Sequence, residues 1–298
     1  MADNDISLGI GNGDNRLPVI GTRVHSILET PPVQFADGPA HRIAYRRWGA
    51  GHPVVLLHPL ALSGEVWGEF AGRLAARFDV IAPDARGHGD SGWDGNPFGI
   101  DDLGDDVAAL LDLLGLPAAH VVGMSMGGST AISLAGRYPE RASTMFLADT
   151  TAWYGAEAPQ TWEKRAQGVV AQPREQQVVF QVDRWFTEGF RRRQPAEANR
   201  VVGIFLRTSS LAHAQACRAL GAMDSRGLLP KITAPVLAVT GVEDYATPPE
   251  MGKAIADGVP GGRARVLDAL RHMSLVEDPA LAALAAAFLG GGEEEVPE

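Results

Sequence analysis

The 298-residue chain contains a single cysteine, Cys217, so it has no disulfide framework. Because nothing near Cys217 resembles a Cys–His catalytic pair, we expect this thiol to be a small buried apolar group. The sequence also has no run of about 18 or more apolar residues, which excludes an obvious membrane-spanning helix. Its first residues lack the basic start and apolar core of a signal peptide, so a cytoplasmic protein is expected.

Positive charge is scarce as well, with 26 Lys and Arg residues against 36 Asp and Glu residues and a net charge of -10. This balance disfavours nucleic acid and anionic membranes as partners. Hydrophobic residues make up 45% of the chain, as in an ordinary globular enzyme. The motifs described below favour a small-molecule substrate, with no metal or cofactor expected, and the sequence leaves the oligomeric state open.

The order of apolar and amphipathic segments predicts the domain organisation. Residues 33–149 and 230–290 alternate short apolar strands with helices, which is typical of a mostly parallel sheet covered by helices on both faces. Residues 150–229 have helical patterns and no buried strand, so they are predicted to form a cap over the sheet. Residues 1–32, rich in Gly, Asn and Asp, are predicted to be a flexible extension, and residues 291–298 an acidic tail.

One stretch has the pattern of a nucleophile elbow, the sharp strand-to-helix turn that exposes a catalytic side chain. A buried strand is predicted over residues 119–123, and a helix begins at Ser125 within the sequence Gly-Met-Ser-Met-Gly-Gly. Gly123 and Gly127 lie two positions on either side of the serine, where such a turn leaves no room for side chains. The pattern predicts that Ser125 is a nucleophile at a helix N-terminus.

A serine nucleophile needs a base and an orienting acid, which in this architecture follow later strands in the order Ser, acid, His. Asp244 comes directly after the apolar run 235–240 and is the predicted acid. Thr247 and Glu250 have the spacing of a capping box, which predicts that a helix begins there and leaves Asp244 in the preceding loop. Glu243 is the alternative acid, and a solvated loop carboxylate is the non-catalytic interpretation of Asp244.

His272 follows the last predicted strand, residues 264–270, and is the predicted base. Ser274 and Glu277 repeat the capping-box spacing, so a helix is expected to begin just after the histidine. His120, on the elbow strand, and His213, in the predicted cap, have no such position and are interpreted as structural.

The oxyanion hole needs two backbone N–H groups near the nucleophile. We predict Met126, the residue after Ser125, and Leu60 in the loop after the third strand, because Pro59 has no N–H. His58 is expected to brace that loop. Residues 84–91 contain Asp, Arg and His, but their spacing fits no common zinc pattern, so we interpret them as a structural turn.

With these positions assigned, the chain resembles the α/β-hydrolase fold over residues 33–290. The resemblance implies a mostly parallel eight-stranded sheet with a helical cap inserted after the sixth strand. The elbow and the segments 84–91, 183–191 and 244–249 look most like the 3-oxoadipate enol-lactonase branch, whose members hydrolyse an enol-lactone with a carboxymethyl arm. Epoxide hydrolases and haloalkane dehalogenases are disfavoured, since their elbow carries an aspartate.

Two departures from this branch keep other activities open: the first 32 residues are extra, and residues 58–61 differ from the Ser-Leu-Gly type of oxyanion loop. A carboxylesterase, a carbon–carbon bond hydrolase and a perhydrolase are the alternatives within the fold. A biosynthetic cyclase and a ligand-binding member without turnover are alternatives outside hydrolysis.

If the substrate carries a carboxylate, the cap must supply a cation. Arg184 and Arg191 are the predicted contacts, with Arg192 and Arg193 as further candidates, and Trp162 and Trp185 are predicted pocket walls. The competing interpretation is that the arginines form a solvated helix face and the aromatic residues pack the cap.

Overall fold

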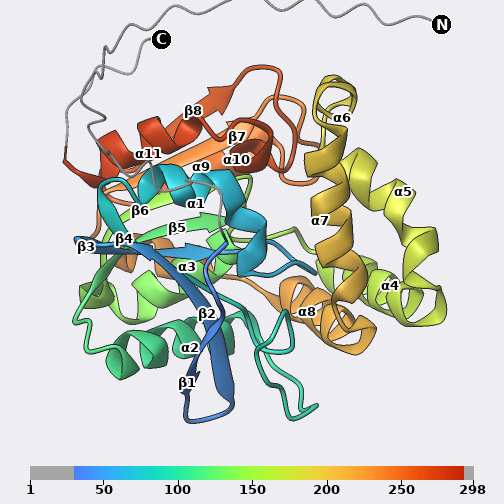
Figure 1. The fold of residues 1–298 in the computed structure, drawn as a ribbon, viewed down its shortest axis with the longest axis horizontal. Helices are drawn as coiled ribbons and strands as arrows, with labels where there is room; N and C mark the ends of the chain where they lie inside the picture. The colour runs from blue at the N-terminus through green and yellow to red at the C-terminus, as the bar shows by residue number, and fades with distance from the viewer. Residues whose placement is uncertain (1–29, 292–298) are drawn as a thin grey trace, which may run out of the picture.

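The computed structural model describes residues 30–291, in which a single eight-stranded sheet forms the centre of the molecule (Figure 1). The strand order is β1-β2-β4-β3-β5-β6-β7-β8, and all neighbours from β4 to β8 are parallel. Only β1 and β2 run antiparallel to their neighbours. The strands are β1 (Gln34–Asp37), β2 (Arg42–Gly49), β3 (His52–Leu57), β4 (Phe78–Pro83), β5 (Ala119–Met124), β6 (Ala142–Ala148), β7 (Val236–Gly241) and β8 (Arg263–Leu267). The predicted eight-stranded, mostly parallel sheet is confirmed.

Helices cover both faces of the sheet, because its central strands are apolar on both sides. Phe70 and Leu289 belong to the core cluster on one face, and Ile132 and Ile255 to the cluster on the other. The helices flanking the sheet are α1 (Gly68–Leu74), α2 (Ile100–Leu113), α3 (Met126–Arg137), α9 (Pro249–Gly258), α10 (Ser274–Glu277) and α11 (Leu281–Leu289).

Five further helices lie between β6 and β7 in the sequence and stand beside the sheet as a separate group (Figure 1). They are α4 (Ala158–Ala171), α5 (Arg174–Trp185), α6 (Glu188–Arg193), α7 (Pro195–Arg207) and α8 (Ser210–Ala222). We call this group the cap. Its apolar side chains, among them Trp185 and Phe205, join the same core cluster as those of α1 and α11, so the cap and the sheet share one apolar interior.

The predicted extension over residues 1–32 and tail over residues 291–298 lie almost entirely outside the described residues. Within residues 30–291, no helix is both long enough and apolar enough to cross a membrane.

Candidate active site

Ser125 lies between β5 and α3 with φ 55° and ψ -121°. Residues other than glycine rarely adopt this backbone conformation. A Cβ at Gly123 would lie 2.6 Å from the carbonyl oxygen of Gly127, and one at Gly127 would overlap the carbonyl of Leu57. The flanking glycines are thus required by close backbone packing, as the elbow pattern indicates.

The structure brings the three predicted catalytic side chains together in one hydrogen-bonded chain. The Oγ of Ser125 is 2.9 Å from Nε2 of His272, and Nδ1 of His272 is 2.8 Å from Oδ2 of Asp244. All three side chains are buried. Because the carboxylate accepts from Nδ1–H, Nε2 is left without a proton and can accept the one on Ser125.

The loop after β7 holds Asp244 by more than its contact with the histidine. Oδ1 accepts the backbone N–H groups of Ala246 and Thr247, and Oδ2 accepts the hydroxyl of Thr247 at 2.7 Å. Burial would raise the pKa of Asp244, but the charge of His272 and these hydrogen bonds outweigh it, so the pKa lies below its ordinary value. The carboxylate is therefore held ionised.

The two predicted capping boxes are wrong. The hydroxyl of Thr247 donates to Asp244, and α9 begins at Pro249 without a side-chain cap. After β8, the carboxylate of Glu277 accepts the N–H of Arg271 at 2.9 Å and both the N–H and the hydroxyl of Thr187. Each pattern does lie near the start of a helix. Its polar side chains, however, form hydrogen bonds with the loops that carry the triad and with the cap.

The predicted oxyanion loop after β3 is anchored by the cap. Ala61 has φ 61°, and its carbonyl accepts the hydroxyl of Thr208 at 2.9 Å. Within residues 30–291, neither the N–H of Leu60 nor that of Met126 donates a hydrogen bond to another protein group. Both groups are therefore free to bind an oxygen of a ligand.

A small, partly open pocket lies between the nucleophile and the cap. Ser125, His272 and Leu60 line its base, and the predicted contacts Trp162, Arg184 and Trp185 line its cap side. Arg191 does not line it. The guanidinium of Arg191 lies 3.4 Å from Asp183, and that of Arg192 lies 2.7 Å from Glu188 at the surface.

Tyr154 and Arg165 also line the pocket, and the sequence reasoning missed both. The guanidinium of Arg165 lies over the ring of Trp162 at 4.9 Å, and one of its NH groups is 3.4 Å from Oε1 of Gln181. Its Nε is buried without a hydrogen-bond partner in the described structure. Burial, and then the charge of Arg184, lowers the pKa of Arg165 to about 10. The available signal was the three-residue spacing from Trp162, which places both on one helix face.

Comparison with known proteins decides the family. The sequence profile of the alpha/beta hydrolase fold family matches residues 52–279. The chain belongs to this family. It is 35% identical over 226 residues to 3-oxoadipate enol-lactonase 2 of Acinetobacter baylyi, covering 76% of this chain and 84% of that one.

Solved structures of other alpha/beta hydrolases have the same architecture. The enol-lactonase of Burkholderia xenovorans is 29% identical, with a TM-score of 0.82, and the match covers 86% of this chain and all of that one. A thermophilic esterase of Thermogutta terrifontis is 26% identical, with a TM-score of 0.81, and the match covers 87% and 98% of the two chains.

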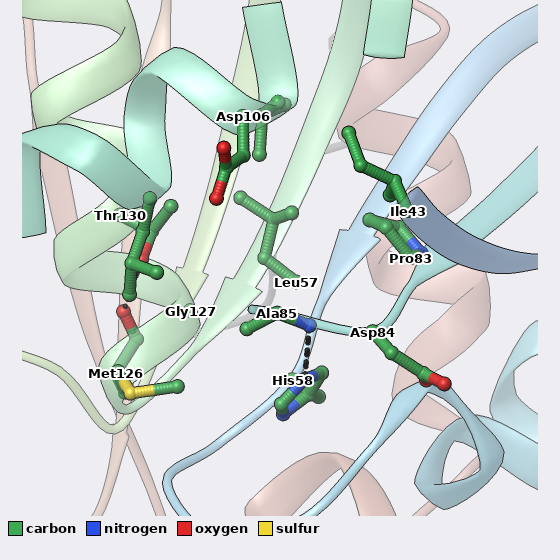
Figure 2. Close-up of a pocket in the computed structure, with 12 residues that line it drawn as sticks. Ile43, Leu57, His58, Pro83, Asp84, Ala85, Asp106, Met126, Gly127 and Thr130 are labelled. Carbon is green, nitrogen blue, oxygen red and sulfur yellow. Dashed lines mark hydrogen bonds between the residues drawn. The ribbon is translucent and has the colours of Figure 1, made fainter. Parts of the chain in front are cut away.

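In this alpha/beta hydrolase, the side chain of His58 forms hydrogen bonds that hold the loop after β3. His58 lies beside a small, mostly apolar cavity behind the elbow, where its Nε2 accepts the N–H of Ala85 (Figure 2). Its Nδ1 is 2.7 Å from the carbonyl of Pro59, so both ring nitrogens are used. Burial lowers the pKa of His58 to about 4, which keeps the ring neutral. These contacts fit the bracing role expected from the sequence.

The turn after β4 is held by hydrogen bonds within it and by one from the segment after β3. The carboxylate of Asp84 accepts the N–H groups of Gly64 and Asp90, and Ser91 donates to the carbonyl of Asp84. Cys217 is fully buried in the cap, where burial raises the pKa of its thiol to about 11. Neither feature lies on the pocket that contains Ser125.

Proposed function

We propose that this alpha/beta hydrolase opens a lactone or carboxylic ester through an acyl-enzyme on Ser125, with an enol-lactone of the 3-oxoadipate type as the favoured substrate. The observation that carries the proposal is the hydrogen-bonded chain from Asp244 through His272 to Ser125 at the base of a lined pocket. Such a chain activates an otherwise weak hydroxyl nucleophile.

In the first half of the reaction, Nε2 of His272 takes the proton of Ser125 as its Oγ attacks the carbonyl carbon of the substrate. The N–H groups of Met126 and Leu60 hold the resulting oxyanion. The ring carbon–oxygen bond then breaks, and the leaving enol oxygen takes the proton from His272. Asp244 stabilises the imidazolium that exists between these two transfers.

In the second half, His272 takes a proton from water, whose oxygen attacks the acyl carbon. The bond to Ser125 breaks, and the serine oxygen takes the proton back. The products are a ring-opened acid and the free enzyme, so no cofactor is needed for the balance of atoms and electrons.

Two arginines favour a substrate that carries a carboxylate. Arg165 and Arg184 both line the pocket, and within residues 30–291 neither has a carboxylate within 4.0 Å. Because the charge of Arg184 lowers the pKa of Arg165, an anion bound between the two guanidinium groups would relieve this repulsion. The similarity to enol-lactonases points the same way, since an enol-lactone with a carboxymethyl arm has such a group.

Hydrolysis of 3-oxoadipate enol-lactone, measured beside p-nitrophenyl esters and plain γ-lactones, tests the proposal. We expect efficient opening of the enol-lactone that is lost in Ser125→Ala. Turnover of the neutral esters or lactones alone would retain the serine mechanism and contradict the carboxylate-bearing substrate. Absence of Ser125-dependent turnover on every substrate would contradict the hydrolase proposal.

A further inference from the structure

Asp149 directly follows β6 and is fully buried beneath the triad, with its backbone at φ 49°. Its Oδ1 accepts the N–H of Gly241 at 3.0 Å, and its Oδ2 accepts the N–H of Ser274 at 2.9 Å. Gly241 ends β7, three residues before Asp244, and Ser274 comes two residues after His272. One carboxylate therefore connects the two segments that carry the acid and the base.

The residues on either side of Asp149 hold the third triad segment. The carbonyl of Ala148 accepts the N–H of Ser125 at 2.9 Å, and the hydroxyl of Thr150 donates to the carbonyl of Ser125 at 2.6 Å. Residues 148–150 thus bind the backbone around all three members of the triad. None of these three residues lines the pocket, so their contribution is to geometry and charge.

The two backbone N–H groups around residue 149 require a side chain with two acceptor oxygens, which a carboxylate provides. Two backbone N–H groups point at the side chain and each needs an acceptor oxygen. An asparagine would offer one oxygen and turn an NH₂ group toward the other donor. The ionisable groups that face Asp149 are Asp244, from the loop after β7, and His272, from the loop after β8. Burial, followed by the charge of Asp244, raises the pKa of Asp149 to about 7, so its charge changes in the neutral range.

We propose that Asp149 is a positioning residue for acyl transfer. Its carboxylate fixes the spacing between the Asp244 and His272 loops, and its negative charge stabilises the imidazolium that forms on His272. The inference rests on the proposed serine mechanism and is independent of which lactone or ester is the substrate.

The test uses the second-order rate at which a fluorophosphonate labels Ser125 in the full-length protein from pH 5 to pH 9. For Asp149→Asn we expect labelling at pH 8 to fall about 10 to 100-fold, because the base is misplaced. We also expect the wild-type rate to change around pH 7, where the charge of Asp149 changes, and the variant to lose this step, because it has no carboxyl there. Asp149→Ser, which also removes the charge, replaces the asparagine variant if that protein does not fold.

Asp106→Asn is the matched control. Asp106 is also a buried carboxylate, but its side-chain hydrogen bonds go to Arg86. We expect this variant to lose stability and to keep the wild-type pH profile. If an Asp149 variant shows lower thermal stability with an unchanged profile, like the control, the positioning role is wrong. Absence of Ser125-dependent labelling in the wild type would instead overturn the proposed mechanism itself.

Discussion

The hydroxyl of Thr247 donates to Oδ2 of Asp244 at 2.7 Å, and this same oxygen faces Nδ1 of His272 at 2.8 Å. Thr247 therefore supports the charge and the orientation of the acid. Replacing it with valine keeps the shape of the side chain and removes the donor.

We expect Thr247→Val to lower kcat by about tenfold, because the acid orients the base less well. The free energy of unfolding should fall by about 1.5 to 3 kcal/mol, the range for a lost hydrogen bond to a charged group. Steady-state kinetics and urea unfolding measure the two effects. Thr144→Val is the control, since this buried threonine of β6 donates only to the carbonyl of Ser143, and an equal loss of kcat there would refute the role of Thr247.

The two pocket arginines should determine the affinity for an anionic substrate. We expect Arg165→Gln and Arg184→Gln each to raise KM for 3-oxoadipate enol-lactone by about tenfold or more, since each removes a charge-assisted contact. KM for a neutral p-nitrophenyl ester should change little. Arg192→Gln, in a surface arginine paired with Glu188, should leave both values unchanged. A similar rise in KM for both substrates would mean that the arginines shape the pocket without recognising charge.

Backbone packing at the elbow should not tolerate a side chain at Gly127. Because a Cβ there would overlap the carbonyl of Leu57, we expect Gly127→Ala to lower the free energy of unfolding by about 3 kcal/mol or more. Gly168→Ala is the matched substitution within helix α4, where nothing lies within 4 Å of the added carbon. That variant should gain about 0.5 to 1 kcal/mol in urea unfolding. Equal effects at the two positions would contradict the packing explanation.

His58 should make the protein less stable in acid. Its pKa is about 4 in the folded state against 6.5 ordinarily, so the unfolded chain binds the proton first as pH falls. The stabilisation is complete above pH 6.5 and is lost as pH falls to about 4, a difference of about 3 kcal/mol.

Thermal unfolding at pH 7, 5.5 and 4.5 measures this dependence. His58→Gln should be less stable than the wild type at pH 7 and should lose less stability between pH 7 and pH 4.5. His52→Gln is the control, because His52 is an exposed histidine at the start of β3. This variant should show the same dependence of thermal stability on pH as the wild type. If His58→Gln loses as much thermal stability between pH 7 and pH 4.5 as the wild type does, groups other than His58 cause the acid sensitivity.

The sheet, the elbow and the positions after the strands could be predicted because they depend on local patterns. Apolar runs identify buried strands, and the steric limits at Gly123 and Gly127 arise within one turn of the chain. The order of Ser125, Asp244 and His272 then follows from the order of the strands.

The errors and omissions arose where partners distant in the sequence determine what a side chain does. Asp149 is 92 residues from Gly241 and 125 residues from Ser274, so no local pattern marks it as a link between the triad loops. Glu277 matched a local cap, but its carboxylate binds Thr187 of the cap, 90 residues away. The spacing of residues in the sequence is compatible with a local helix cap and with a distant partner, so it cannot decide which of the two a side chain binds.

The most direct test of the account is the rate and site of fluorophosphonate labelling in the wild type, Ser125→Ala and His272→Gln. The account predicts modification of Ser125 in the wild type, none in Ser125→Ala, and labelling slowed by about 1,000-fold or more in His272→Gln, because the hydroxyl then lacks its base. Labelling of another residue, or labelling of Ser125 at the same rate without His272, would contradict it.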